Sequence, residues 1–273
     1  MQQADKGDQR TAKTDPVWNW KFRLLRAEIL LWQGKSKESN ALIDSPPPKL
    51  ISGELALRTK LIQGRALYIQ GNVPAAQSIL AEAEQLAKTS NPDLMGEVKL
   101  AQGTLQHDKE NYDGAQQFFR QALLLARQYH QPLLEAKVLG SLTRLDTARE
   151  HYDPALDSGR NALDISDSIH ARHIGAITRL NVGWCSLELG DLKEAERYFN
   201  DSEKVSAEIG MKKVQQEDLN NLGRVYFNQD NYDRAKDYFQ RALDIADQRG
   251  DESSAAIYLD NLSVVSLAFG HID

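Results

Sequence analysis

One stretch of the sequence, LNNLGRVYFNQDNYDRAKDYFQRAL at residues 219–243, predicts two helices separated by a short polar turn. Its first half carries apolar residues at the three- and four-residue spacing of one α-helical face: Leu219, Leu222 and Tyr226. Its second half continues the same period: Tyr232, Ala235, Phe239 and Ala242. Because Asp230 and Asn231 favour a turn between the halves, we predict a helix–turn–helix unit.

This unit recurs along the chain at a nearly constant spacing. The aligned small residues of the second helix lie 37, 39, 40, 40 and 40 residues apart: Ser39, Ala76, Ala115, Ala155, Ala195 and Ala235. A constant period of this length is typical of solenoids, in which each unit buries its apolar face against its neighbours. A generic helical bundle is the alternative, but a bundle does not require a constant period. We therefore predict an all-α solenoid of helix pairs.

Two further positions repeat with the same period. The small residue at Gly223 recurs in the other units: Gly64, Gly103, Gly183 and Ser263. An aromatic residue recurs in the second helices: Phe119, Phe199 and Phe239. We expect the small residues to let paired helices approach closely, and the rings to fill the gap between neighbouring units.

These residues resemble the tetratricopeptide repeat family in order and spacing: Leu222, Gly223, Tyr226, Tyr232, Ala235, Phe239 and Ala242. The repeats are longer than the roughly 34 residues usual in that family, and are similar to its long-helix variety of about 40 residues. The resemblance implies a right-handed superhelix of antiparallel helix pairs, whose first helices line a concave groove. It implies an array over residues 16–273, and because residues 1–15 are polar we expect them to form a flexible tail. The pairs would begin near residues 20, 57, 96, 136, 176 and 216, with a terminal half-repeat at 254–273.

The composition disfavours several classes of protein. The 33 Lys and Arg residues face 39 Asp and Glu residues, and a net charge of −6 argues against nucleic-acid or anionic-membrane binding. No apolar stretch is long enough to cross a bilayer. The first 15 residues lack the apolar core of a signal peptide, which favours a cytoplasmic location. Cys185 is the single cysteine, so no internal disulfide can form.

No catalytic or metal-binding motif stands out. His170 and His173 lie in an expected loop between repeats, and no carboxylate is placed to complete a metal set with them. Cys185 has no nucleophile motif around it, so we expect a small buried hydrophobe. No glycine-rich phosphate loop occurs. The sequence therefore predicts a protein without catalytic activity, cofactor or metal.

The family resemblance also places a groove. One register of the first helices carries these residues: Arg65, Thr104, Arg144, Trp184, Arg224 and Val264. Arginine offers a planar fork of donors suited to carboxylates, and an asparagine amide can both donate and accept along an extended main chain. We therefore predict a peptide-binding groove formed by Arg65, Tyr68, Arg144, Trp184, Leu187, Asn220, Arg224 and Phe227. In the alternative interpretation, the arginines pair with acidic residues of neighbouring helices: Glu97, Glu188 and Asp260.

Two functions remain open. The first is a non-catalytic interaction scaffold that binds a protein or peptide, acidic or with a free carboxylate, in its concave groove. The second is the regulatory segment of a larger enzyme, because WKFRLLRAEILL at residues 20–31, followed by Pro46–Pro48, is similar to the N-terminal arrays of bacterial proteins that end in a CHAT protease domain.

The first and last repeats of the array depart from the regular pattern. Pro46–Pro48 is expected to truncate the second helix of the first pair. The last helix is too apolar for a good solenoid cap, since it contains Val264, Val265, Leu267, Ala268 and Phe269. We therefore expect a further helix or domain to follow it in the parent protein, and its exposed face to offer a surface for self-association.

Overall fold

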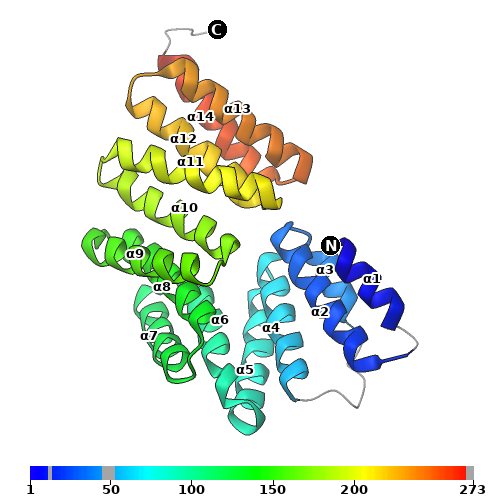
Figure 1. The fold of residues 1–273 in the computed structure, drawn as a ribbon. Helices are drawn as coiled ribbons and strands as arrows, with labels where there is room; N and C mark the ends of the chain where they lie inside the picture. Colours follow the sequence, from blue (N-terminus) through cyan, green and yellow to red (C-terminus); the bar gives the residue numbers. More distant parts are fainter. Residues whose placement is uncertain (12–13, 45–52, 269–273) are drawn as a thin grey trace. The chain divides into compact units, whose positions relative to one another are not determined.

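The computed structural model describes residues 1–11, 14–44 and 53–268. In these ranges the chain forms fourteen α-helices and one short 3-10 helix, with no strand (Figure 1). The prediction of an all-α protein is therefore confirmed. The chain divides into two units, Met1–Leu134 and Glu135–Asp273, and each is described by itself.

The N-terminal unit consists of α1 (Gln2–Thr11), α2 (Pro16–Trp32), α3 (Ser36–Ile43), α4 (Gly53–Ile69), α5 (Val73–Ser90), a 3-10 turn (Pro92–Leu94), α6 (Met95–His107) and α7 (Tyr112–Gln128). Consecutive helices pair as α2 with α3, α4 with α5, and α6 with α7. The helix α3 has only 8 residues, whereas α5 has 18. The second helix of the first pair is therefore short, as predicted, although Pro46–Pro48 lie outside the described residues.

The first helix, α1, differs from the expected flexible tail. Its Asp8 is 9% exposed, forms an ion pair with Arg26 of α2, and accepts a hydrogen bond from Asn19 Nδ2 at 2.6 Å. Asp5 of the same helix lies 2.7 Å from Arg26 Nε. Polar and charged contacts therefore join this polar segment to α2, which its composition did not indicate.

The C-terminal unit contains α8 (Pro132–Ala148, from Glu135 on), α9 (Tyr152–Ser168), α10 (Arg172–Glu188), α11 (Leu192–Ile209), α12 (Lys212–Asn228), α13 (Tyr232–Arg249) and α14 (Glu252–Ala268). Each of these helices from α9 on contacts the next one along the chain. The first helices begin earlier than the expected residues 176 and 216. Their first turns start at Arg172 and Lys212. These turns are polar or contain glycine, so the apolar spacing that marks a helix is weak there.

The turns between helices also repeat with the forty-residue period. Ten of the described turns, though not the connection between α5 and α6, contain a residue with positive φ, from 51° to 79°: Gly34, Gly71, Glu110, His130, Glu150, His170, Gly190, Gly210, Asp230 and Gly250. Several of the following helices begin with an Asn or Asp side chain that accepts a backbone N–H, as Asn231 does from Arg234 at 3.3 Å. Gly250 ends α13 at φ 63°, in the left-handed conformation that glycine favours at the end of a helix.

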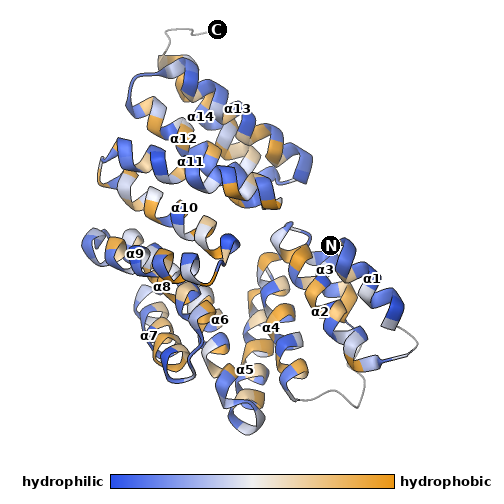
Figure 2. Ribbon diagram, in the orientation of Figure 1, coloured by the Kyte–Doolittle hydropathy of each residue, from blue (hydrophilic) through white to orange (hydrophobic). Residues whose placement is uncertain are grey.

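The aromatic residues of the repeat pack directly on its glycines. A Cβ at Gly103, Gly183 or Gly223 would lie within 2.5 to 2.8 Å of the ring of Phe119, Phe199 or Phe239, respectively. Two of these rings also contact the next helix pair, because Phe199 clusters with Leu222 and Val225, and Phe239 with Val265. The expectation that aromatic rings fill the gaps between neighbouring repeats is confirmed for Phe199 and Phe239, and each ring packs on the glycine of its own repeat. Hydrophilic residues predominate along α11 and α13, with hydrophobic residues between them (Figure 2).

Candidate functional site

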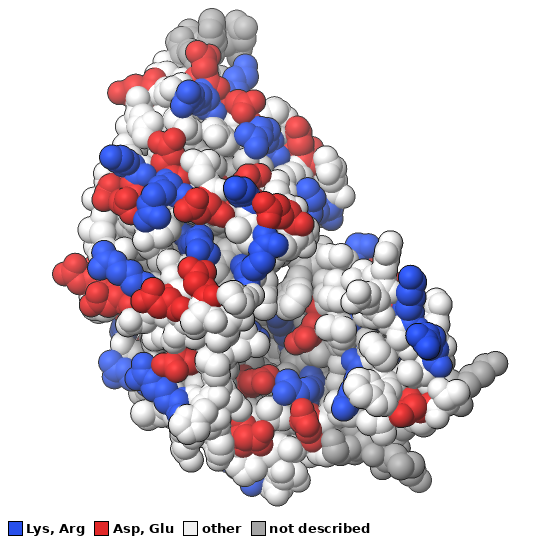
Figure 3. Space-filling model, in the orientation of Figure 1, with Lys and Arg blue, Asp and Glu red and all other residues white. Residues whose placement is uncertain are grey.

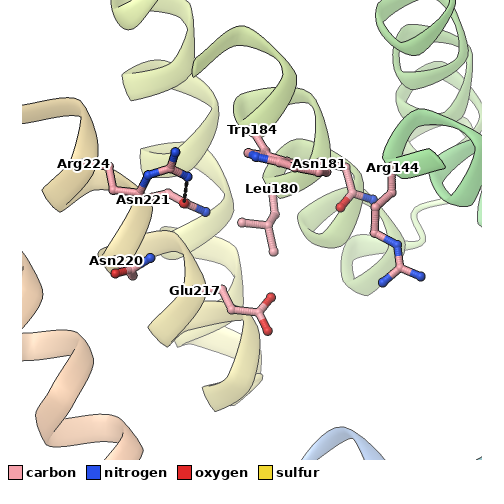
Figure 4. Close-up of a pocket in the computed structure, with 8 residues that line it drawn as sticks. All are labelled: Arg144, Leu180, Asn181, Trp184, Glu217, Asn220, Asn221 and Arg224. Atoms are coloured by element: carbon pink, nitrogen blue, oxygen red, sulfur yellow. Dashed lines mark hydrogen bonds between the residues drawn. The ribbon is translucent and has the colours of Figure 1, made fainter. Parts of the chain in front are cut away.

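A pocket of about 270 Å³ lies along α8, α10 and α12 of the C-terminal unit (Figure 4). Eight residues line it: Arg144, Leu180, Asn181, Trp184, Glu217, Asn220, Asn221 and Arg224. Four of the predicted groove residues are therefore brought together here, namely Arg144, Trp184, Asn220 and Arg224. Each comes from a first helix of its repeat, and the repeat period aligns these helices side by side.

Three asparagines of this pocket each use only part of their hydrogen-bonding capacity. Asn181 Nδ2 donates to the carbonyl of Gly140 at 3.0 Å. Asn220 Oδ1 accepts from Asn261 Nδ2 at 2.8 Å, and Asn221 Oδ1 accepts from Arg224 Nη1 at 3.5 Å. Within the described part of the chain, the amide oxygen of Asn181 and the amide nitrogens of Asn220 and Asn221 bond to nothing else. The pocket therefore offers one acceptor and two donor groups to a ligand.

Arg224 is held in place by an acidic neighbour. Its Nη2 lies 3.1 Å from Glu188 Oε1 of α10, and the Trp184 indole N–H donates to the same carboxylate oxygen at 3.0 Å. Arg224 therefore follows the alternative interpretation of the arginines, because it pairs with Glu188 of a neighbouring helix. This ion pair is only partly buried, with side chains 40% and 35% exposed, so a ligand carboxylate can compete for the guanidinium.

Glu217 also lines this pocket and was not among the predicted residues. Desolvation is the main cause that raises the pKa of its carboxyl, while Lys213, 3.8 Å away, acts in the opposite direction. The sequence held a signal for it, because Glu217 lies four residues before Asn221 and therefore on the same helix face. The pocket combines basic, acidic and amide groups over an apolar floor formed by Leu180.

Two predicted groove residues occupy other places in this unit. Leu187 is 4% exposed and packs in a core cluster with Phe199 and Leu222, so it is unavailable to a ligand in the described conformation. Helical register alone could not separate this core position from the groove. Phe227 lines a second, smaller pocket of about 190 Å³ beside Arg224 and Val264.

The two predicted groove residues of the N-terminal unit lie on α4. Arg65 is exposed, and no hydrogen bond or ion pair joins it to another described residue, although desolvation of its guanidinium lowers its pKa and Glu28 acts in the opposite direction. Tyr68 donates its hydroxyl to Asp108, whose other carboxylate oxygen lies 2.9 Å from His107 Nδ1. Arg58, in contrast, pairs with Glu54 at 3.0 Å and Glu97 at 3.4 Å, which leaves Arg65 as the more available cation on this helix.

Cys185 and His173, two of the residues with reactive side chains considered in the sequence, are both at least partly buried. Cys185 is buried, and this burial raises the pKa of its thiol, as expected for a small core residue. Burial, aided by Lys137, lowers the pKa of His173. Within the described ranges no three His, Cys, Asp or Glu side chains are grouped so that they could hold a metal ion. No described helix is both long and apolar enough to span a membrane.

Charged side chains of both signs are spread over the visible face of the C-terminal unit (Figure 3). On the face shown in Figure 3, Lys and Arg alternate with Asp and Glu over α10 to α14. This face carries no continuous basic stripe of the kind that follows a nucleic-acid backbone.

Comparison with known proteins agrees with the repeat pattern. Tetratricopeptide repeat models match residues 97–129 and 218–273. The chain contains tetratricopeptide repeats, and the predicted α-solenoid of helix pairs is confirmed.

Several individual proteins are similar to this chain. Response regulator aspartate phosphatase J of Bacillus subtilis (strain 168) is 28% identical over 102 residues, a match that covers 37% of the chain and 27% of that relative. The structure of a Rap protein complexed with competence and sporulation factor has a TM-score of 0.74 at 18% identity, covering 94% of this chain and 75% of that one. NprR in complex with its cognate peptide NprX has a TM-score of 0.70 at 16% identity, covering 100% and 81%. The matched region spans only about a quarter of the phosphatase, and the two structures share the fold with this chain.

Proposed function

We propose that the protein is a non-catalytic interaction scaffold whose C-terminal unit binds an extended peptide segment along α8, α10 and α12. The observation that carries this proposal is the set of free amide groups in the pocket. A peptide main chain presents alternating N–H and C=O groups. The Asn181 oxygen suits a main-chain N–H, while the Asn220 and Asn221 nitrogens suit main-chain carbonyls. Burial of such groups without partners is unfavourable, so a ligand that satisfies them gains affinity.

Side-chain specificity comes from the walls of the same pocket. Leu180 and the Trp184 ring form its apolar part, and Trp184 is held through its indole N–H by Glu188. A rigid aromatic group of this kind is a common energetic anchor in binding sites. Arg144 and Arg224 favour a partner that carries an acidic side chain or a free carboxylate. NprR, which shares the fold, was solved with a bound peptide, and this lends support to the proposal.

A selection experiment tests the proposal without a known ligand. Random peptides displayed on phage would be selected against the protein, and the affinity of a selected synthetic peptide measured by calorimetry. Replacing Asn220 and Asn221 by alanine should weaken binding by roughly tenfold or more, since two hydrogen bonds are lost. Asn200→Ala is the matched control, because Asn200 is exposed on α11 and does not line the pocket. Failure to select any peptide, or equal affinity of both variants, would contradict the proposal.

A further inference from the structure

A second pocket adjoins the first at Arg224. It has a volume of about 190 Å³ and six lining residues: Arg224, Phe227, Asn228, Phe239, Asn261 and Val264. Arg224 also lines the first pocket, so the two are neighbours along the same surface. The floor of the second pocket is apolar, because Phe227, Phe239 and Val264 form it, and its edge carries amide groups.

Comparison with the preceding repeat explains why this second pocket is open. Forty residues earlier, the positions of Asn228 and Val264 are held by Glu188 and Arg224. That arginine reaches across from α12 to Glu188 of α10 at 3.1 Å, and Leu187 beneath is only 4% exposed. Valine is too short and too apolar to form such a bridge to Asn228. Val264 is 42% exposed, and Phe227 borders an open cavity.

We propose that the second pocket binds one aromatic side chain of the peptide whose main chain lies in the first pocket. This inference rests on the proposed function and names the class of ligand more closely. A cavity of about 150 Å³ in a protein core is large enough to bind benzene, so the observed volume accommodates a phenylalanine ring. The rings of Phe227 and Phe239 provide the edges and faces against which another aromatic ring packs favourably.

The amides at the edge connect the two pockets for a continuous ligand. Asn261 Nδ2 donates to Asn220 Oδ1 of the first pocket at 2.8 Å, which leaves the Asn261 oxygen open to a ligand N–H. The exposed Asn228 amide makes no hydrogen bond to the described residues. The amides of Asn261 and Asn228 can therefore hydrogen-bond the peptide main chain beyond the first pocket, next to the point where the aromatic side chain enters the second pocket.

A fragment titration tests the second pocket independently of any selected peptide. N-acetyl-L-phenylalanine methylamide and its alanine counterpart would be added to ¹⁵N-labelled protein, and the amide signals of residues 227, 228 and 261–265 followed. We expect saturable shifts with the phenylalanine compound and at least tenfold weaker binding of the alanine compound. Absence of saturable shifts, or equal affinities, would overturn the proposal.

A closed-pocket variant provides the second arm. Asn228→Glu with Val264→Arg installs the ion pair that closes the preceding repeat, and Leu267→Arg on the same helix, 60% exposed and outside the pocket, is the control. The double variant should abolish fragment shifts at an unchanged melting temperature, while the control keeps them. Persistent binding in the folded double variant would overturn the inference, as would loss in the control. If the fragment binds but no peptide is ever selected, the proposed function fails and the aromatic site stands.

Discussion

The ring of Phe239 occupies the space that a side chain at Gly223 would need. A Cβ at Gly223 would lie 2.5 Å from Phe239 Cε1, although real Cβ atoms do not approach other atoms this closely. The two residues lie on the paired helices α12 and α13, and the ring also packs against Val265 of α14. One glycine thus sets the distance between two helices and, through the ring, the position of a third.

We expect Gly223→Ala to destabilise the protein by about 1–3 kcal/mol, the usual cost of overpacking a core. Alanine would favour the helix by about 1 kcal/mol, so the clash must exceed this gain. Chemical denaturation measures the net change in unfolding free energy from the clash and the helix preference. Gly175→Ala is the control, because the one close contact of its Cβ would be with the flexible end of Arg179, while Asp167 lies at an ordinary 3.7 Å, and that variant should be neutral or stabilised. A Gly223→Ala variant as stable as wild type would show that the ring can move aside at little cost.

Stability should fall with rising pH because of Asp218. This residue has no exposed surface, and its Oδ2 accepts hydrogen bonds from Ser202 at 2.8 Å and Ser206 at 3.3 Å. Its Oδ1 has no partner in the described part of the chain. Burial raises the pKa of Asp218 well above its ordinary value, so the folded state binds this proton more tightly than the unfolded state. The resulting stability is full below the unfolded pKa and is lost as pH rises through the folded pKa.

Asp218→Asn removes this titration. The variant should melt at a higher temperature than wild type at about pH 8, and its melting temperature should change less between about pH 4 and pH 8. Calorimetric scans across this range provide the measurement. Asp237→Asn, at a side chain 67% exposed on α13, should leave the wild-type pH profile unchanged. Parallel profiles for wild type and Asp218→Asn would mean that Asp218 stays ionised when folded.

A turn offers a stabilising substitution. Glu150 follows α8 with φ 62°, a left-handed conformation that Gly190 adopts at the equivalent turn of the next repeat. Glycine adopts this conformation without the steric cost that a Cβ imposes. We expect Glu150→Gly to raise the unfolding free energy by about 0.5–1 kcal/mol, as measured by urea denaturation. Glu150→Ala keeps the Cβ and should bring no such gain; an equal gain in both variants would place the effect elsewhere.

Charge reversal at Arg65 tests the N-terminal unit. No described residue forms a hydrogen bond or ion pair with Arg65, although Glu28 acts on its guanidinium electrostatically, whereas Arg58 pairs directly with Glu54 and Glu97. For an acidic peptide that binds the N-terminal unit, Arg65→Glu should weaken binding about tenfold or more at low salt, with a smaller effect at high salt. Arg58→Glu should weaken it less. Unchanged affinity in Arg65→Glu would exclude this arginine from the binding surface.

Much of the candidate site followed from helical register. Trp184 and Arg224 occupy the same position in the first helices of two consecutive repeats, and Asn220 lies one turn before Arg224. The structure places all three in one pocket. Leu187 shared the pattern but lies in the core, because residues at the boundary between groove and core differ by only a small rotation about the helix axis. Glu217 was missed, although its four-residue offset from Asn221 put it on the same face.

The sequence by itself determined the class of fold and the length of its units, because apolar period, turn residues and repeat spacing are local properties of the chain. It also identified Phe239 and Gly223 as matched positions of one unit. Only the tertiary structure decided which groups remain open to a ligand. Arg224 is bridged to Glu188 whereas Val264 leaves a cavity, and each outcome depends on side chains from neighbouring repeats, whose distance and reach are set only once the helices have packed.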